Sequence, residues 1–395
     1  MTHNTGPLSG VRIVDVTSVL SGPAATGILA DQGADVIKVE PFEGDIMRGR
    51  GTLASMSAGF VACNRGKRSI ALDLKRDEAR DIMWRLIESA DVFTQNFRPG
   101  AIERLGFGAE VVRERRPSLI YLSISGVGES GPYAEKRVYD PVIQALSGLA
   151  DIQADPVSGR PKMVRTLIAD KTTAIYAAQA VSAALYARER SGEGQHIRLS
   201  MLDTMVSYLW PEGMAPFTVV ENDVQSARAS EHDMIFATAD GYITLGAVSD
   251  KEWRGLCQAL NRLEWIEDPR FRTGADRSAN RQERLEEVER ALGDRGSREI
   301  IAALEAADVP CAPVHRRRAM IDDPQVQSNQ LVHEVEQPGI GTLRQARPAA
   351  RFDRTPSAPP RPAPALGENG DDILREIGYS DDAIQTLKDD AIVLG

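Results

Sequence analysis

The chain has 395 residues and a formal net charge of −10 at pH 7, with 42% hydrophobic and 26% charged residues. Its length suggests two or three domains, and the negative charge argues against a general nucleic-acid-binding protein. The apolar stretches are shorter than the roughly 18 residues of a membrane span, and the polar N-terminus has no signal-peptide core. We therefore expect a cytoplasmic globular protein with no membrane or nucleic-acid partner.

The first third of the chain alternates between apolar strands and amphipathic helices. The pattern predicts strands over residues 11–16, 35–40, 69–72, 92–94 and 119–124, with helices over 22–30 and 79–87. Apolar strands that alternate with helices form parallel sheets covered on both faces. This part of the chain is therefore predicted to be an α/β domain with a parallel sheet.

One carboxylate precedes a long segment of small residues. A short apolar approach over 167–169 leads to Asp170, a helix is predicted over 172–187, and another strand over 196–200. An acid at the start of a helix lies in the positive end of the helix dipole, which favours its ionised form. Such a residue can be a nucleophile or an ordinary N-cap, and position alone leaves both interpretations open.

The pattern changes after residue 208. Residues 209–233 lack periodicity and are predicted to link two domains. A hairpin over 236–245 with an Asp240–Gly241 turn, followed by helices over 251–261, 281–292 and 298–307, predicts a smaller α+β domain. The proline-rich segment 355–364 is predicted to be an extended surface strap, and helices over 371–377 and 381–388 close the chain.

Several common cofactor and catalytic motifs are missing. The segment 22–27 is not G-x-G-x-x-G, and a proline stands at position 23 where close backbone approach would be needed. Neither a P-loop nor a G-x-S-x-G elbow occurs. The five histidines and three cysteines have no metal-ligand spacing. We expect neither a metal site nor a permanently bound cofactor.

Basic residues gather near the ends of three predicted strands. They lie in 64–68 and at Lys75 around the third strand, in 96–100 and at Arg104 after the fourth, and at 136–137 after the fifth. Open α/β sheets bind ligands at the carboxyl ends of their strands. The residues could hold the separated phosphates of one ligand or could be solvated surface charges.

Many ordered segments of this chain resemble the class III coenzyme A-transferases, the formyl-CoA transferase and carnitine CoA-transferase type. The resemblance covers nearly the whole length and is specific as a set. It is carried by Leu8–Asp15, Ser21–Pro23, Gly33–Glu40, Asn64–Lys75, Gln95–Gly100, Leu105–Gly106, Tyr139–Asp140, Gln144–Ala145, Asp170, Gly192–Gln195, Pro310–Val314 and Leu366–Glu368.

The resemblance implies a two-domain subunit in an interlocked homodimer. A large Rossmann-like, CoA-binding domain would begin with residues 1–208, and a linker over 209–233 would lead to a small α+β domain over 234–320. Residues 321–395 would link back to the large domain and complete it. The implied substrates are an acyl-CoA and a free carboxylic acid, with coenzyme A as a substrate and not as a resident cofactor.

The resemblance also assigns residues to the site. It implies that Asp170 is the catalytic nucleophile, which forms a mixed anhydride and then an aspartyl-CoA thioester. The residues it implies for CoA binding are Leu72, Asp73, Lys75, Asn96, Phe97, Arg98, Arg104, Arg137, Tyr139 and Asp140.

Two departures bear on the activity. The formyl-CoA transferase type has a glycine run in its small domain, whereas residues 214–240 contain no glycine, so oxalate and formate are not expected substrates. The related α-methylacyl-CoA racemases pair their aspartate with a histidine in a Gly-His-Asp segment, and this chain has Val138-Tyr139-Asp140 there. Tyrosine, with an ordinary pKa of about 10, is poorly suited to proton exchange near neutral pH. A racemase-type enzyme and a non-catalytic CoA-binding protein remain the alternatives.

Overall fold

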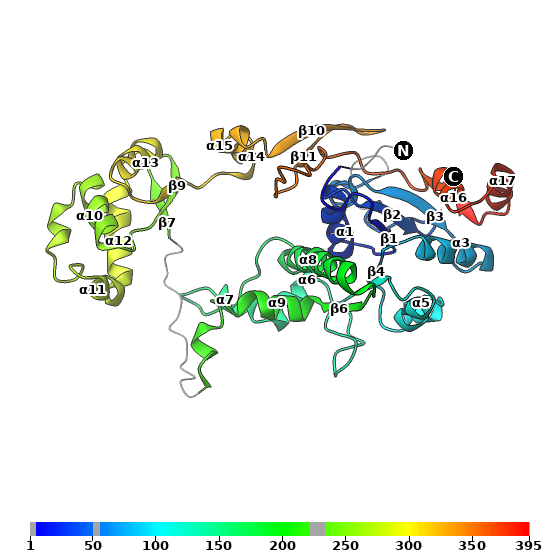
Figure 1. The fold of residues 1–395 in the computed structure, drawn as a ribbon. Coiled ribbons are helices and arrows are strands. Elements are labelled where there is room, and N and C mark those ends of the chain that lie inside the picture. The colour runs from blue at the N-terminus through cyan, green and yellow to red at the C-terminus, as the bar shows by residue number, and fades with distance from the viewer. Residues whose placement is uncertain (1–4, 50–55, 221–233, 395) are drawn as a thin grey trace. The chain divides into compact units, whose positions relative to one another are not determined.

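The computed structural model describes residues 5–49, 56–220 and 234–394 (Figure 1). The chain divides into two compact units. A large unit comprises Met1–Gln153, Met163–Val224 and Asn329–Gly395, and a small unit comprises Ala154–Lys162 and Gln225–Ser328. Within the described ranges, none of the helices combines the length and the apolar character needed to cross a membrane.

A seven-stranded sheet forms the centre of the large unit. Its order is β12-β3-β2-β1-β4-β5-β6, and all neighbours pair in parallel except β12, which is antiparallel to β3. The predicted mostly parallel sheet is confirmed. The strands are β1 (Arg12–Asp15), β2 (Asp35–Glu40), β3 (Arg68–Leu72), β4 (Val92–Gln95), β5 (Ile120–Ser125), β6 (His196–Ser200) and β12 (Val393–Leu394).

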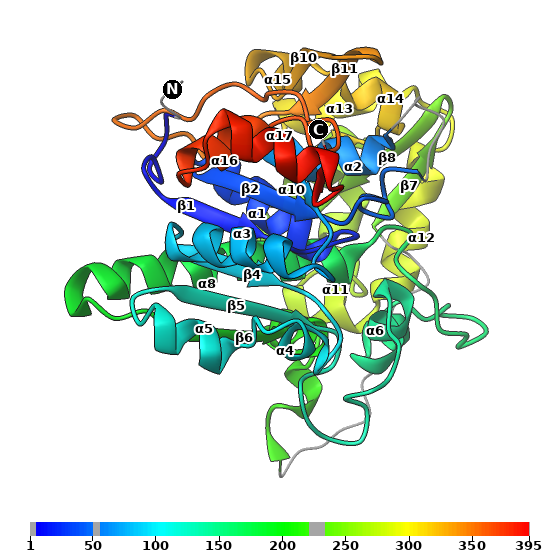
Figure 2. The same ribbon diagram turned by 90° about the vertical axis from the view of Figure 1, so that its right-hand side faces the viewer.

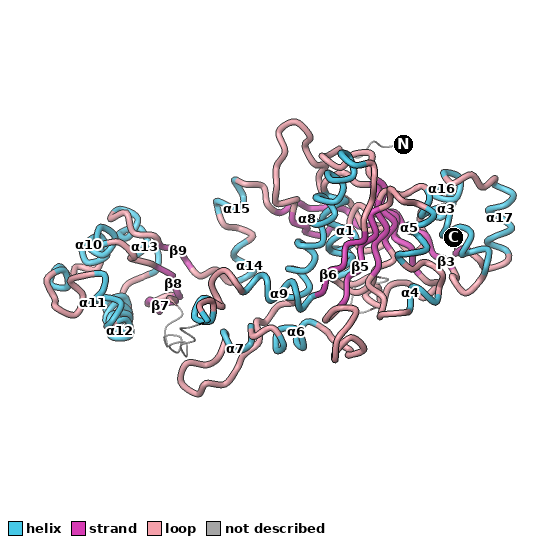
Figure 3. The backbone as a smooth tube through the Cα atoms, turned by 60° about the horizontal axis from the view of Figure 1, so that its bottom comes forward, coloured by secondary structure: helices cyan, strands magenta, loops and turns pink. Residues whose placement is uncertain are grey.

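Successive strand residues face opposite layers of helices. Ile13 packs in the layer with α1 (Ser21–Asp31) and α8 (Ile168–Ser191), whereas Val14 packs in the layer with α3 (Asp77–Glu88). Figure 3 shows the two layers on either side of the sheet. The alanine-rich face of α8 lets it pack closely on α1. The layer with α3 also includes α5 (Ala109–Arg115), α16 (Gly370–Glu376) and α17 (Asp381–Asp389).

The end of the chain returns to the strands of its beginning. In Figure 2 the C-terminal helices lie beside the first strands of the sheet, and β12 pairs with the outer edge of β3. An antiparallel hairpin, β10 (Val332–Gln337) with β11 (Gly341–Ala346), precedes this return and was not predicted. The other elements of the large unit are α2 (Ala58–Asn64), α4 (Ala101–Arg104), α6 (Asp140–Leu146), α7 (Leu149–Ile152), α9 (Met201–Leu209) and the short η1 (Ala215–Phe217).

The small unit is an α+β arrangement around an aromatic core. Trp253 stacks on Trp265 with ring centroids 6.1 Å apart, and both contact Phe271. A three-stranded antiparallel sheet has the order β7-β8-β9. Its elements are β7 (Ile235–Thr238), β8 (Gly241–Leu245), α10 (Asp250–Ala259), η3 (Leu263–Ile266), α11 (Gly274–Ala279), α12 (Arg281–Leu292), α13 (Ser297–Ala306), β9 (Cys311–Pro313), α14 (Arg317–Met320) and α15 (Pro324–Ser328).

The hairpin turn of the small unit lies one residue earlier than predicted. Thr238 pairs with Gly241, so Ala239 and Asp240 form the turn and Gly241 begins β8. The carboxylate of Asp240 accepts the backbone N–H of Ser297 at 2.7 Å, which fixes Asp240 at the tip against the start of α13. The Asp-Gly pair therefore does not provide both central residues of the turn.

Candidate active site

The order of the strands places a topological switch point at the middle of the sheet. From β1 the chain moves outward through β2 and β3, and then returns to the other side of β1 for β4, β5 and β6. This is the 3-2-1-4-5-6 order of doubly wound sheets, which bind ligands outside the carboxyl ends of the strands at the switch point. A ligand site is therefore expected at the segments that follow β1 and β4.

Asp170 lies in the first turn of α8, but not at its N-cap. The helix begins at Ile168, so Asp170 is its third residue, and Leu167 holds the cap position without a side-chain cap. The N-cap interpretation of Asp170 is therefore wrong. The helix starts earlier than predicted because a carboxylate from another element supplies its cap.

That carboxylate belongs to Asp140, the first residue of α6, which is only 1% exposed. Its Oδ2 accepts the backbone N–H groups of Ala169 at 2.7 Å and of Asp170 at 3.2 Å. Its Oδ1 accepts a hydrogen bond from Gln144 Nε2 at 2.5 Å, and Gln144 Oε1 accepts the N–H of Val164. The segment before α8 and the first turn of α8 are thus held by α6.

The carboxylate of Asp170 has an unusual environment. Burial, followed by the negative charge of Asp140, raises its pKa to about 6, while hydrogen bonds from the hydroxyl and backbone N–H of Ser21 act in the opposite direction. Ser21 is the first residue of α1. The carboxylate is therefore flanked by the N-termini of two helices, whose positive ends favour a negative charge.

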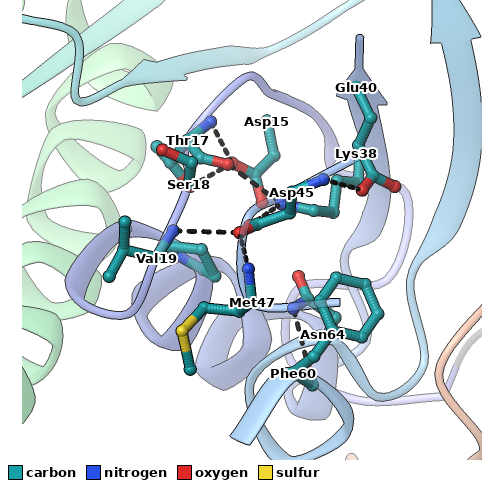
Figure 4. A network of polar contacts seen from close by, with 12 residues as sticks. Asp15, Thr17, Ser18, Val19, Lys38, Glu40, Asp45, Met47, Phe60 and Asn64 are labelled. Atoms are coloured by element: carbon teal, nitrogen blue, oxygen red, sulfur yellow. Dashed lines mark hydrogen bonds and ion pairs between the residues drawn. The ribbon is translucent and has the colours of Figure 1, made fainter. Parts of the chain in front are cut away.

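The loop from Thr17 to Leu20 connects β1 to α1, and side chains from other segments hold it by hydrogen bonds to its backbone groups (Figure 4). Asn96, just after β4, accepts the Ser18 N–H at 2.9 Å and donates to the Ser18 carbonyl at 2.8 Å. Asp45 accepts the N–H of Val19 at 3.3 Å. Val19 has φ +72°, which is a strained conformation for a β-branched residue, and it persists because these contacts hold the backbone of Ser18 and the N–H of Val19.

Buried charges lie directly beneath this loop. Asp15 accepts a hydrogen bond from the Thr17 N–H at 2.9 Å, and Lys38 Nζ donates to the Thr17 carbonyl at 2.9 Å (Figure 4). Lys67 Nζ also donates to Asp15, at 2.9 Å. Burial alone would raise the pKa of Asp15, but the charges of Lys67 and Lys38 hold it well below its usual range. Gly22 belongs to the same packing, since a Cβ there would lie 2.4 Å from Thr17 Cβ.

Four basic residues predicted for CoA binding are exposed and follow the carboxyl ends of the strands. Their side chains form no ion pair among the residues that the structure describes. Arg98 and the aromatic Phe97 border a cavity of about 200 Å³ between the segments after β4 and β5. The Phe97 N–H donates to Gln95 Oε1 at 2.7 Å, which sets the course of that segment. The four basic residues are Lys75, Arg98, Arg104 and Arg137.

The other predicted CoA-binding residues differ in accessibility. Leu72 is buried and pairs with Val393 of β12, and the N–H of Asp73 donates to the Ile392 carbonyl at 3.3 Å. The outer edge of β3 is therefore already used by the chain itself. Tyr139 is 68% exposed, whereas the carboxylate of Asp140, one residue later, is fully occupied by the contacts described above.

The basic segment 64–68 does not form a phosphate site, contrary to one of the two sequence interpretations. It lies at the amino end of β3, and its charges are paired within the fold. Lys67 contacts Asp15, Arg65 pairs with Asp31, and Arg68 pairs with Asp35 at 2.6 Å and with Glu376 at 2.8 Å. Pairing leaves this segment without free positive charge for a ligand, unlike the carboxyl edge.

The fold and site together define an α/β protein with a part-buried carboxylate near the switch point and, among the described residues, exposed cations without ion-pair partners after the carboxyl ends of the strands. The comparisons identify the class. The sequence model of the family described as CoA-transferase family III matches residues 8–370. The chain is 35% identical to a succinate–glutarate CoA-transferase of Agrobacterium fabrum, over 95% of this chain and 97% of that protein.

Two further matches agree. The chain is 33% identical to the human succinyl-CoA:glutarate CoA-transferase, over 99% of this chain and 91% of the human protein. A crystal structure of a CAIB/BAIF family protein from Brucella suis superposes with a TM-score of 0.83 at 31% identity, covering 94% of this chain and 100% of that one. This chain belongs to the family III CoA-transferases, and it is an enzyme.

Sequence reasoning missed two features of this site. Ser21 was noted only as part of a motif, although the structure brings it from α1 to the carboxylate of Asp170. Asp140 was assigned to CoA binding, and nothing in the sequence indicated that its carboxylate caps a helix that begins 28 residues later. Within the described ranges, no group of three or more His, Cys, Asp or Glu side chains is arranged to hold a metal ion.

Proposed function

We propose that this enzyme moves coenzyme A from an acyl-CoA to a free carboxylic acid through covalent intermediates on Asp170. The observation that carries the proposal is the position of Asp170, a part-buried carboxylate between two helix N-termini whose pKa is raised to about 6. A carboxylate of this basicity is ionised at neutral pH and is more nucleophilic than an ordinary aspartate.

The proposed first half-reaction exchanges the donor acid for Asp170. An Asp170 oxygen attacks the thioester carbonyl, the C–S bond breaks, and CoA thiolate is released. The acyl group and Asp170 now form a mixed anhydride. The thiolate then attacks Cγ of Asp170, the anhydride bond breaks, and the donor acid departs as a carboxylate. The product is an aspartyl-CoA thioester, so the free energy of the original thioester is conserved without ATP.

The second half-reaction is the reverse with a different acid. The acceptor carboxylate attacks Cγ of Asp170 and releases CoA thiolate, which then attacks the acyl carbon of the new anhydride. This step forms the product acyl-CoA and restores the Asp170 carboxylate. No water or net proton is consumed. The N-terminus of α1 offers a positive field where charge develops in each tetrahedral intermediate.

The carboxyl edge of the sheet is the proposed CoA site. Lys75, Arg98, Arg104 and Arg137 would bind the separated phosphates, because these cations have no ion-pair partner in the part of the chain that the structure describes and are available for charge-assisted hydrogen bonds. Phe97 and Tyr139 would contact the apolar parts of the ligand and Asp73 its nucleotide end, whereas Leu72, which is buried and pairs with β12, would act only by positioning Asp73. Asn96 and Asp140 would act mainly by holding the loop 17–20 and the start of α8 in place.

We propose short dicarboxylic acids as the exchanged acids. The names of the Agrobacterium and human relatives specify succinate and glutarate, and both proteins match this chain over nearly its full length. The absence of glycine over 214–240 argues against a formyl-CoA type of loop; residues 221–233 of that segment lie outside the described ranges. We also propose the homodimer that the family resemblance implies, which light scattering would detect as twice the chain mass.

A racemase would need a second acid or base beside Asp170. The residue at the corresponding position is Tyr139, whose side chain is 68% exposed. Of the three described histidines, His196 and His315 hydrogen-bond to Ser123 and Asp323, and His333 lies on β10 opposite Gln345. The transferase is therefore the function we propose. A racemase would exchange the α-proton of a branched acyl-CoA with solvent deuterium, which a transferase does not require.

Trapping of the intermediate tests the proposal. Wild type and D170N would be incubated with succinyl-CoA or glutaryl-CoA and hydroxylamine, followed by peptide mass spectrometry. We expect a hydroxamate confined to the Asp170 peptide of the wild type, together with CoA transfer to added glutarate or succinate. Transfer by D170N at the wild-type rate, or a hydroxamate on another residue, would overturn the assignment of Asp170. The exposed-site variant D151N serves as a matched control.

A further inference from the structure

A cavity of about 370 Å³ lies within the small unit and plays no part in the proposed reaction. The hairpin β7–β8, α10, α11 and the first two turns of α12 surround it. Its walls include apolar side chains, and the charged residues that line it are all arginines: Arg277, Arg281 and Arg284. No aspartate or glutamate is among its lining residues. The cavity therefore has mainly apolar walls, and the charged side chains that line it are positive.

The positive charge of this cavity is only partly balanced. Arg277 is 2% exposed; its guanidinium pairs with Asp250 and donates to the Phe271 carbonyl at 3.0 Å. Arg281 and Arg284 have no ion-pair partner anywhere in the described ranges. Burial, and then the neighbouring charges of Arg281 and Arg277, lowers the pKa of Arg284. An anion in the cavity would relieve this repulsion.

A buried hydrogen-bond donor lines the same cavity. Trp253 is 2% exposed, and its indole Nε1–H has no acceptor in the part of the chain that the structure describes. The Arg277 guanidinium carbon lies 5.5 Å from the centre of the Trp253 ring. A buried indole N–H normally has an acceptor, because a buried donor without one has lost its hydrogen bond to water and gained none in return. A ligand with an acceptor oxygen would complete it.

We propose that this cavity is a second binding site, for a small organic acid with a short hydrocarbon body. Its carboxylate would pair with Arg281 and Arg284 and accept the Trp253 N–H, and its chain would pack on apolar residues such as Phe236, Leu285 and Val288. The site lies wholly within the small unit and does not depend on Asp170 being the nucleophile. Occupancy would make the small unit a sensor of organic acids.

A local probe can test this proposal in the intact enzyme. Incorporation of 5-fluorotryptophan gives one ¹⁹F signal for each of the 4 tryptophans, and single Trp→Phe variants assign them. The labelled protein would be titrated with glutarate, hexanoate and inorganic phosphate in separate experiments. We expect glutarate or hexanoate to shift the Trp253 signal saturably, with a Kd at or below the millimolar range. The Trp84 and Trp210 signals, which report on the large unit, provide the reference.

Variants make the test specific. The double variant R281Q/R284Q should weaken the organic acid by about tenfold or more, which corresponds to loss of one charge-assisted bond. R298Q, an exposed arginine on α13 outside the cavity, should bind as the wild type does. Unchanged binding in R281Q/R284Q, a response to phosphate alone, or no saturable shift with any probe would overturn the proposal. Unchanged CoA transfer in R281Q/R284Q would show that its active site remains intact.

Discussion

The backbone N–H of Asp170 donates to Oδ2 of Asp140 at 3.2 Å, so that one buried carboxylate fixes the helix turn that carries the other. The same closeness has an electrostatic consequence, because the charge of Asp140 adds to burial in raising the pKa of Asp170. The carboxylate of Asp140 accepts hydrogen bonds from two N–H groups of α8 and from Gln144. The pair thus combines a fixed position with raised basicity, which are the two properties that a carboxylate nucleophile needs.

The pH dependence of the reaction should report Asp170. Only the ionised carboxylate can attack, and its pKa is raised to about 6. We expect kcat/KM for the acyl-CoA to be nearly constant around neutral pH and to fall about tenfold per pH unit below about pH 6. Initial rates over that range would measure it. An acid limb near the ordinary aspartate pKa of about 4 would contradict the proposed environment of Asp170.

The variant D140N should move that acid limb. It removes the negative charge that helps to raise the pKa of Asp170 while keeping an oxygen that can accept from the start of α8. We expect the acid limb of the pH profile to shift to lower pH. It should not reach the ordinary aspartate pKa, because burial contributes more than Asp140 to the raised pKa of Asp170. The pH profile of kcat/KM separates this effect from a general loss of activity. A lower rate with an unchanged limb would mean that Asp140 acts only through structure.

Ionised Asp170 should lower the stability of the folded enzyme. Its folded pKa of about 6 lies above the ordinary aspartate value of 3.8, so the folded state retains a proton that the unfolded state has lost between these two values. Stability therefore falls as pH rises through this window, and the full cost, roughly 2–3 kcal/mol, applies above it. Because D170N cannot titrate, we expect it to be more stable than the wild type at about pH 8.

Thermal unfolding of both proteins would measure this difference. The advantage of D170N should shrink as pH falls from about 6 to about 4, where the wild-type carboxyl group becomes neutral in both states. The exposed-site variant D151N should follow the wild type over the whole range. A constant difference between D170N and the wild type at all pH values would show that packing, and not charge, separates them.

The sheet could be predicted from the sequence, whereas much of the site could not. The strands around Val14 and Val92 are apolar runs that are buried on both faces, and such runs are distinctive. The hairpin β10–β11 escaped prediction because charged residues such as Glu334 and Arg344 alternate with few apolar ones in largely exposed strands. A strand is recognised from its sequence by the apolar residues that it buries, and β10 and β11 bury few.

The start of α8 shows why part of the site could not be predicted from the sequence. Sequence rules look for a capping residue beside the helix, but Leu167 stands there and the capping carboxylate comes from Asp140 in another element. The position of Asp170 alone favours an ordinary N-cap, and the prediction that Asp170 is the nucleophile comes from the family resemblance. A long-range cap requires the tertiary structure to be known.

The two lysines that flank β3 should have opposite phenotypes. Lys67 is buried at the amino end, where its Nζ contacts Asp15, Asn64 and a backbone carbonyl, and burial lowers its pKa to about 8. K67M would leave the buried charge of Asp15 without its ion-pair partner and should destabilise the protein by about 3–5 kcal/mol. Lys75 is exposed at the carboxyl end without an ion-pair partner in the described ranges. K75M should change stability by less than about 0.5 kcal/mol.

The two variants should also differ in how they change the kinetics. K75M would lose one proposed charge-assisted contact to a CoA phosphate, so we expect about a tenfold rise in the KM for acyl-CoA with a similar kcat. Folded K67M, assayed well below its unfolding temperature, should lose activity through kcat, because the loop 17–20 above Asp15 would no longer hold Ser21 against Asp170. Thermal midpoints and steady-state kinetics on the same preparations would measure both effects. A stable K67M enzyme with a raised KM would restore the segment 64–68 as a phosphate site and would contradict the structural role assigned to Lys67.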